Sequence, residues 1–212
     1  MTTQEQPGPQ DRPAPRERPG TRERLVRGTQ ELLWERGYVG TSPKAILERA
    51  DAGQGSMYHH FTGKSDLALT ALRRTVRDMA EAAEECLTGP GTAYDRVAAY
   101  LLRERQVLRG CPVGRMTQDR EVVDSPELRA PLDEMFGRLR ERIAEVLAEG
   151  QRRGELAGGL DPVACAATVA AVVQGGYVLA RAADDTAPFD AAVRGVLSLL
   201  ATQVLPAAGP TD

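Results

Sequence analysis

Five of the eight residues from position 54 to 61, including both histidines of the sequence, carry side chains that form directional hydrogen bonds. If this stretch is one short helix, Met57 and Phe61 lie four residues apart and share a buried face. The amide, hydroxyl and imidazole groups of the other positions then face outward, where such groups can bind base edges and phosphate oxygens of DNA. The base contacts are expected from Gln54, Ser56 and His59.

Neighbouring groups suit contacts to the DNA backbone. Gly55 has no Cβ and allows a close approach. Tyr58 offers its hydroxyl to a phosphate, with its ring expected to pack beneath. Hydroxyls at the start of the preceding helix and nearby basic groups add further contacts. These additional DNA-binding candidates are Thr41, Ser42, Lys44, His60 and Lys64.

Other interpretations of these side chains remain open. His59 and His60 could form a metal or catalytic pair, but adjacent helical residues diverge by about 100 degrees, which disfavours chelation of one ion. For Phe61, simple core packing is expected. Arg22, at the start of the first helix, could touch DNA or belong to a solvated face.

Helix-capping and helix-breaking residues predict the elements that position these groups. A helix is expected from about residue 21 to Gly37, and a hydroxyl cap followed by Pro43 starts a short helix that ends at Ala50. The turn 51–53 breaks the pattern before the helix at 54–61. Two short helices joined by a tight turn predict a helix-turn-helix.

Composition limits the classes of protein. The 212 residues carry a net charge of −3, so a general basic patch is absent and DNA contacts must come from a few placed groups. The three cysteines show no Cys-x-x-Cys pair, which favours a reducing cytoplasm. The longest nearly apolar run, Cys165–Val173, is far below the roughly 18 residues of a membrane span, so no membrane partner is expected.

The rest of the sequence shows helical periodicity and no run of alternating β-branched residues. The further helices are expected at 65–87, 94–109, 113–123, 126–154, 161–183 and 188–204. The sequence therefore predicts an all-α chain with a disordered arm at 1–20, a three-helix helix-turn-helix domain at 21–66, a helical regulatory and dimerisation domain at 67–206, and a flexible tail at 207–212.

Residues 24 to 72 resemble the DNA-binding domain of the TetR family of transcriptional regulators. The residues that carry the resemblance are Gly37, Thr41, Ile46, Glu48, Ala50, the run from Gly55 to Phe61, Lys64, Asp66 and Leu67. The resemblance implies a homodimer that binds a palindromic operator and is released by a small-molecule effector of its C-terminal domain. The turn departs from the family's usual Gly-Val-Ser, with Asp51, Ala52 and Gly53 in its place. An intact but weaker turn is expected, because Asp tolerates left-handed backbone and Gly is an acceptable cap.

Side chains of suitable type suggest where an effector would bind. The candidate ligand residues are Tyr100, Cys111, Met116, Met135, Phe136 and Tyr177. Cys111 lies in a Gly-Cys-Pro-x-Gly loop that resembles one in some family members, and it could line a pocket or sense oxidation. The favoured interpretation is a buried turn cysteine, because no resolving cysteine is near in sequence.

Small and apolar residues of the last two helices predict a four-helix dimer interface. The candidate interface residues are Ala167, Ala171, Gly175, Val193, Leu197 and Leu200. An ordinary core within one chain is the alternative.

The expected function is a ligand-responsive DNA-binding regulator, and specifically a repressor. It is expected to need no cofactor and no metal. One rival is an all-α enzyme, although no paired carboxylates or nucleophile with its base follow residue 66. The other is a DNA binder without an effector, or an activator.

Overall fold

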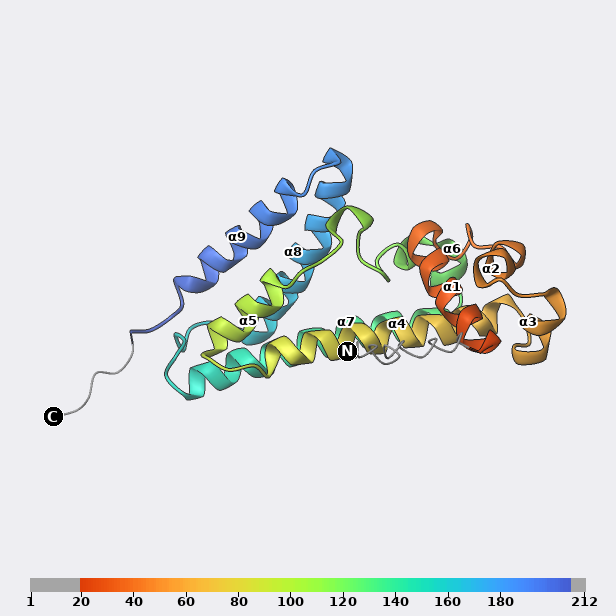
Figure 1. Ribbon diagram of the computed structural model, residues 1–212. Helices are drawn as coiled ribbons and strands as arrows, with labels where there is room; N and C mark the ends of the chain where they lie inside the picture. The colour runs from red at the N-terminus through yellow and green to blue at the C-terminus, as the bar shows by residue number, and fades with distance from the viewer. Residues whose placement is uncertain (1–19, 207–212) are drawn as a thin grey trace, which may run out of the picture.

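The structure is a computed structural model that describes residues 20 to 206. The regular elements of this range are all helices apart from one isolated bridge between Leu156 and Val204, so the all-α expectation is confirmed. The tail expected at 207–212 and all but the last residue of the arm expected at 1–20 lie outside the described residues. Figure 1 shows an elongated molecule with a small group of helices at one end and longer helices at the other.

The helix-turn-helix consists of α2 (Pro43–Ala50) and α3 (Gln54–His60), which pack against α1 (Thr21–Arg36). The Ser42 hydroxyl accepts a hydrogen bond from the Ala45 amide at 3.1 Å and caps α2, as its hydroxyl-proline start predicts. Asp51 adopts the left-handed conformation with φ 47°, and Gly53 caps α3. The expected turn at 51–53 is therefore confirmed in a form that Asp tolerates.

The long helix α4 (Lys64–Leu87) belongs to both ends of the molecule. Its first turns bury Leu67 and Leu72 in the core of the helix-turn-helix domain, and its last turns bury Ala83 and Leu87 among the longer helices. Because one unbroken helix spans the boundary, a tilt of α4 at one end moves the other.

The larger domain is formed by α5 (Ala93–Leu102), α7 (Pro126–Arg152), α8 (Pro162–Ala183) and α9 (Ala187–Ala201), together with the second half of α4. In Figure 1, α4 and α7 run side by side along the lower edge, and α8 and α9 form a pair above α5. Gly176 allows the close approach of α8 to α9, because a Cβ there would lie 2.9 Å from the Phe189 ring.

Two expected helices are shorter or absent. The helix predicted at 94–109 ends at Leu102, and only the 3-10 turn η1 (Val107–Arg109) follows. The Arg105 guanidinium ends α5, because it donates to the carbonyls of Leu101 and Tyr100. The helix predicted at 113–123 is reduced to the 3-10 turn η2 (Met116–Gln118) and the single turn α6 (Arg120–Val123), a segment that reaches across to α1 instead.

For two of the six residues expected in the dimer interface, the prediction is wrong. Val193 and Leu200 are each 3% exposed and lie in the core of their own chain. Ala171 and Gly175 are exposed, while Ala167 and Leu197 are half-buried. The exposed apolar surface of α8 and α9 consists instead mainly of Val163, Val178, Leu179 and Leu199.

The helix α8 is longer and more apolar than the run Cys165–Val173 alone suggests. Its 22 residues have a mean hydropathy of 1.8 in the most apolar window, enough by length and composition to cross a membrane. Helices from the cores of soluble proteins meet the same criterion, but only 33% of this window is buried within the chain. Much of α8 is therefore apolar and uncovered in a single copy of the chain.

Two glycines of α7 provide a matched test of the packing. At Gly150 a Cβ would overlap that of Ala93 and lie 3.0 Å from Leu156, whereas at Gly137 a Cβ would meet nothing within 4 Å. We expect Gly150→Val to lower the free energy of unfolding by about 2 kcal/mol or more, because overpacking displaces α5. Gly137→Val should change it by less than about 0.5 kcal/mol. Urea denaturation followed by circular dichroism measures both, and equal effects would contradict the packing of α7 on α5.

Candidate DNA-binding surface and ligand cavities

The outer face of α3 carries most of the expected base-contacting groups. Gln54 and His59 are exposed, and Ser56 is half-buried. A Cβ at Gly55 would meet nothing within 4 Å, so this side of the helix is open to an approaching surface. Because α3 contains no acidic residue, nothing on the helix itself repels a phosphate backbone.

The inner face of α3 seats the helix. Met57 is 0% exposed and Phe61 is 4% exposed, which confirms their expected packing in the core. The Arg22 guanidinium lies over the Phe61 ring, 5.3 Å from its centroid, so it also covers the end of α3. Tyr58 differs from expectation: its residue is 56% exposed, so the ring projects outward and does not pack beneath the helix.

Before α2, one of the two hydroxyl groups expected to contact DNA is buried. Thr41 is 1% exposed, and its hydroxyl donates to the Gly37 carbonyl at 2.6 Å. The expectation that this hydroxyl faces DNA is therefore wrong in this structure, because Thr41 closes the end of α1 instead. Ser42 and Lys44 are exposed, and Lys44 is 3.9 Å from Glu48 in a solvent-exposed pair.

Lys64 begins α4 beside the helix-turn-helix. Its ammonium group lies 3.9 Å from the centroid of the Tyr38 ring, which holds the side chain in place by a cation–π interaction. His60 is exposed at the end of α3. Its ring lies 4.9 Å from that of His59, centroid to centroid. Within residues 20–206, no group of three His, Cys, Asp or Glu side chains could hold a metal ion.

Sequence reasoning missed the contacts that hold the turn. The Arg24 guanidinium donates to the Ala50 carbonyl at 2.9 Å and to the Asp51 carbonyl at 3.1 Å, where α2 ends. At the other end of α1, Glu35 pairs with Arg49 of α2 at 2.8 Å, and this hydrogen bond holds the pKa of Glu35 below its usual range. An arginine on α1 gives no local signal that it caps a helix 26 residues away.

The end of α1 is joined to the larger domain through segment 107–119. The Trp34 indole donates to the Gly110 carbonyl at 2.9 Å, and the Arg109 guanidinium lies 3.7 Å from the Trp34 ring centroid. The Asp119 carboxylate accepts a hydrogen bond from the Tyr38 amide. This joint connects the helix-turn-helix to the larger domain at a second point besides α4.

The six expected ligand residues do not lie in one cavity. Tyr100 and Met135 line a cavity of about 720 Å³ between α4 and α7. Cys111, Phe136 and Tyr177 line a separate hollow of about 760 Å³ between α7 and α8. Met116 is 0% exposed, and it lines none of the cavities found in the described chain.

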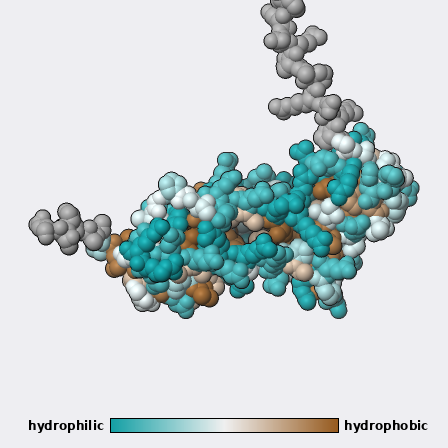
Figure 2. Space-filling model, turned by 90° about the horizontal axis from the view of Figure 1, so that it is seen from below, coloured by the Kyte–Doolittle hydropathy of each residue, from teal (hydrophilic) through white to brown (hydrophobic). Residues whose placement is uncertain are grey.

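The cavity between α4 and α7 has an apolar interior with a charged rim, formed in part by Arg73, Glu81 and Arg138. Seen from the side of α4 and α7, hydrophobic side chains lie along the middle of the molecule between hydrophilic ones (Figure 2). A third cavity, of about 560 Å³, lies at the joint with α1 and is lined by Trp34, Met79 and Tyr177 among others. Met79 and Arg103 line both this cavity and the one between α4 and α7.

Burial decides the protonation of the groups inside the larger domain. Cys111 is 6% exposed, and burial raises the pKa of its thiol, so the thiol is protonated and unreactive near neutral pH. This agrees with the favoured interpretation of a buried turn cysteine. Burial likewise raises the pKa of Tyr177 to about 12 and that of Tyr100 above its usual value.

Comparison with known proteins follows the same division of the chain. Residues 25–71 match the family described as "Bacterial regulatory proteins, tetR family", and residues 92–196 match "Tetracyclin repressor-like, C-terminal domain". The HTH-type transcriptional repressor NemR of Escherichia coli strain K12 is 25% identical over 84% of this chain and 92% of its own.

Solved structures show the same architecture. A TetR transcriptional regulator from Chloroflexus aurantiacus superimposes with a TM-score of 0.78 and 27% identity, over 87% of this chain and 96% of its own. A cysteine variant of the TetR family regulator CifR, complexed with 26-base-pair operator DNA, superimposes with a TM-score of 0.72 and 24% identity. The match covers 88% of this chain and 100% of the CifR chain. With both domains matched by family models and the outward polar face of α3 in place, the chain belongs to the TetR family and is a DNA-binding transcriptional regulator.

Proposed function

We propose that the chain is a repressor that acts as a homodimer on a palindromic operator and is released by a small organic effector. The observation that carries this proposal is the packing of α3: Met57 and Phe61 are buried on its inner face, while Gln54 and His59 are exposed on its outer face and Ser56 is half-buried. A short helix fixed in this way fits the major groove, where these side chains can reach base edges.

The groups around α3 then divide by role. Ser42, Lys44, Tyr58, His60 and Lys64 would contact phosphates and position the domain, with Gly55 allowing close approach. Thr41 would support them from within the core, because its hydroxyl is already bound to Gly37. Arg22 lies near α3 and would add one phosphate contact.

Effector release would work by a shift between two arrangements of the DNA-binding domains. A ligand that fits the cavity between α4 and α7 better when the two α3 helices are wrongly spaced lowers operator affinity by that difference in binding. Both α4 and the joint at Trp34 connect this cavity region to α1 and α3, so a rearrangement around the ligand has a physical route to DNA.

The partner copy would cover the exposed apolar surface of α8 and α9. Leu199 is 69% exposed and Val178 is 59% exposed, and Ala171 and Gly175 continue the surface along α8. We propose that this dimer contact, and not lipid, covers the apolar side of α8. We further propose that the chain works in the cytoplasm, without a catalytic step or a cofactor.

Two substitutions test the division of roles on DNA. Lys64→Ala should weaken binding to all sequences alike and reduce the slope of log affinity against log salt by about one, because one phosphate contact is lost. Gln54→Ala should relax the preference at one base pair and leave the slope unchanged. Fluorescence anisotropy on DNA from upstream of the protein's own gene measures both effects. Identical behaviour of the two variants would overturn the assignment.

A charge placed on α9 tests the dimer. Leu199→Arg should convert the dimer to a monomer, because a guanidinium buried between two apolar surfaces costs several kcal/mol. Glu85→Arg, on an exposed turn of α4, is the control and should leave the mass unchanged. Light scattering at micromolar concentration gives the mass, and a wild-type monomer or a dimeric Leu199→Arg variant would refute the proposed interface.

A further inference from the structure

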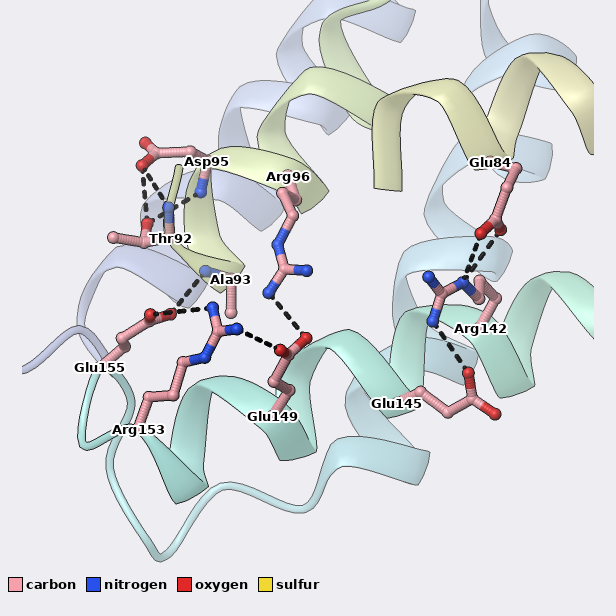
Figure 3. A network of polar contacts seen from close by, with 10 residues as sticks. All are labelled: Glu84, Thr92, Ala93, Asp95, Arg96, Arg142, Glu145, Glu149, Arg153 and Glu155. Carbon is pink, nitrogen blue, oxygen red and sulfur yellow. Dashed lines mark hydrogen bonds and ion pairs between the residues drawn. The ribbon is translucent and has the colours of Figure 1, made fainter. Parts of the chain in front are cut away.

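The arginines around the cavity between α4 and α7 are not equivalent. Arg142 pairs with Glu84 at 2.9 Å and with Glu145 at 3.0 Å, as Figure 3 shows. Arg138 pairs with Glu134 at 2.6 Å. The charges of these two guanidinium groups are already neutralised by carboxylates of the protein.

Arg103 differs from both: like the exposed Arg73 and Arg77 of the same cavity it has no ion pair within the described residues, but unlike them it is half-buried. Its residue is half-buried, its Nε is buried without a hydrogen-bond partner, and its guanidinium forms no hydrogen bond or ion pair within residues 20–206. Its one specific contact is the Tyr100 ring, 5.1 Å from the centroid. A buried guanidinium edge without an acceptor costs free energy, so a bound acceptor would stabilise this arrangement.

A second positive charge lies beside Arg103. The Arg105 guanidinium is 5.2 Å from the same Tyr100 ring centroid. Its terminal nitrogens donate hydrogen bonds to backbone carbonyls at the end of α5. Burial, and then the positive charge of Arg103, lower the pKa of Arg105. Three carboxylates, Glu31, Asp78 and Glu104, line the neighbouring cavity at the joint, but none of them pairs with Arg103. Although glutamates also line the cavity between α4 and α7, neither Arg103 nor Arg105 forms an ion pair with a carboxylate of the described residues.

The cavity that Arg103 lines also has apolar walls. Val76, Met79 and Leu87 from α4 and Met135 and Leu139 from α7 line the same space of about 720 Å³. A cavity of this size suits a ligand with an apolar body of moderate length, fixed in orientation by few polar groups.

We propose that the effector is an organic anion whose carboxylate or phosphate head binds the Arg103 guanidinium while its apolar body fills the cavity between α4 and α7. A guanidinium fork matches the paired oxygens of such a head. The head also weakens the repulsion between Arg103 and Arg105. Since Arg103 lines the cavity at the joint as well, a bound head acts on the wall that faces Trp34.

This inference rests on the proposed effector response, so its test measures binding directly and without DNA. The full chain is titrated with octanoate, octyl phosphate and 1-octanol, and binding is followed by calorimetry and by the fluorescence of Trp34, the one tryptophan of the sequence. We expect at least one of the two anions to bind about tenfold or more tightly than the alcohol, the usual effect of a charge-assisted hydrogen bond. The tighter anion identifies the head.

Variants assign that preference to one side chain. Arg103→Gln should remove the preference for the anion, and Arg103→Lys, which keeps the charge, should retain part of it. Arg77→Gln is the matched control, because Arg77 is an exposed arginine of the same cavity, and it should behave as the wild type. Circular dichroism establishes that each variant is folded.

Several results would overturn the inference: equal affinity of the wild type for anion and alcohol, no binding of either anion, or an undiminished preference in Arg103→Gln. Operator binding is measured separately by gel shift without ligand, where Arg103→Gln should match the wild type. If the wild type fails to bind DNA, the proposed function fails while the anion preference stands. If DNA is bound but the anion is not preferred, only the present inference fails.

Discussion

The contact of Trp34 with segment 107–119 is the constraint on which the arrangement of the molecule depends. The indole donates to the Gly110 carbonyl at 2.9 Å, and the Arg109 guanidinium covers the ring. Without this contact the helix-turn-helix would be attached to the larger domain mainly through α4, and a single long helix can bend between its two ends. The two attachments together define the direction in which α3 faces, and that direction decides whether two copies can reach successive major grooves.

The same joint explains why this protein has so few regular elements between α5 and α7. Residues 103–119 must leave the larger domain, reach the end of α1 and return, and hydrogen bonds to Tyr38 and Trp34 replace those of a continuous helix. Gly110, with φ 85°, allows the reversal at the point of contact. Cavities lie on both sides of this segment, so ligand binding and the orientation of α1 depend on the same residues.

Ion pairing differs between the two ends of the larger domain. At the far end of the larger domain, Arg96 pairs with Glu149 at 3.0 Å, and Arg153 and Glu155 extend the network between α5 and α7 (Figure 3). At the central cavity the half-buried Arg103 has no such pair, and its one specific contact is the Tyr100 ring. The apolar side of α8 and α9 is likewise unbalanced in a single copy of the chain, which is why the proposed dimer completes it.

The elements whose causes are local could be predicted from the amino-acid sequence. The cap at Ser42, the left-handed turn at Asp51 and the four-residue spacing of Met57 and Phe61 each act within one or two helical turns, so α2 and α3 and their outward face could be predicted. Only the tertiary structure decided that Thr41 is buried, that α5 ends at Leu102 and that Val193 and Leu200 face their own core. It also decided that no carboxylate of the described residues pairs with the Arg103 guanidinium. These outcomes depend on contacts between residues far apart in the chain. Hydrophobic periodicity predicts which face of a helix is buried, but it does not predict which other element packs against that face.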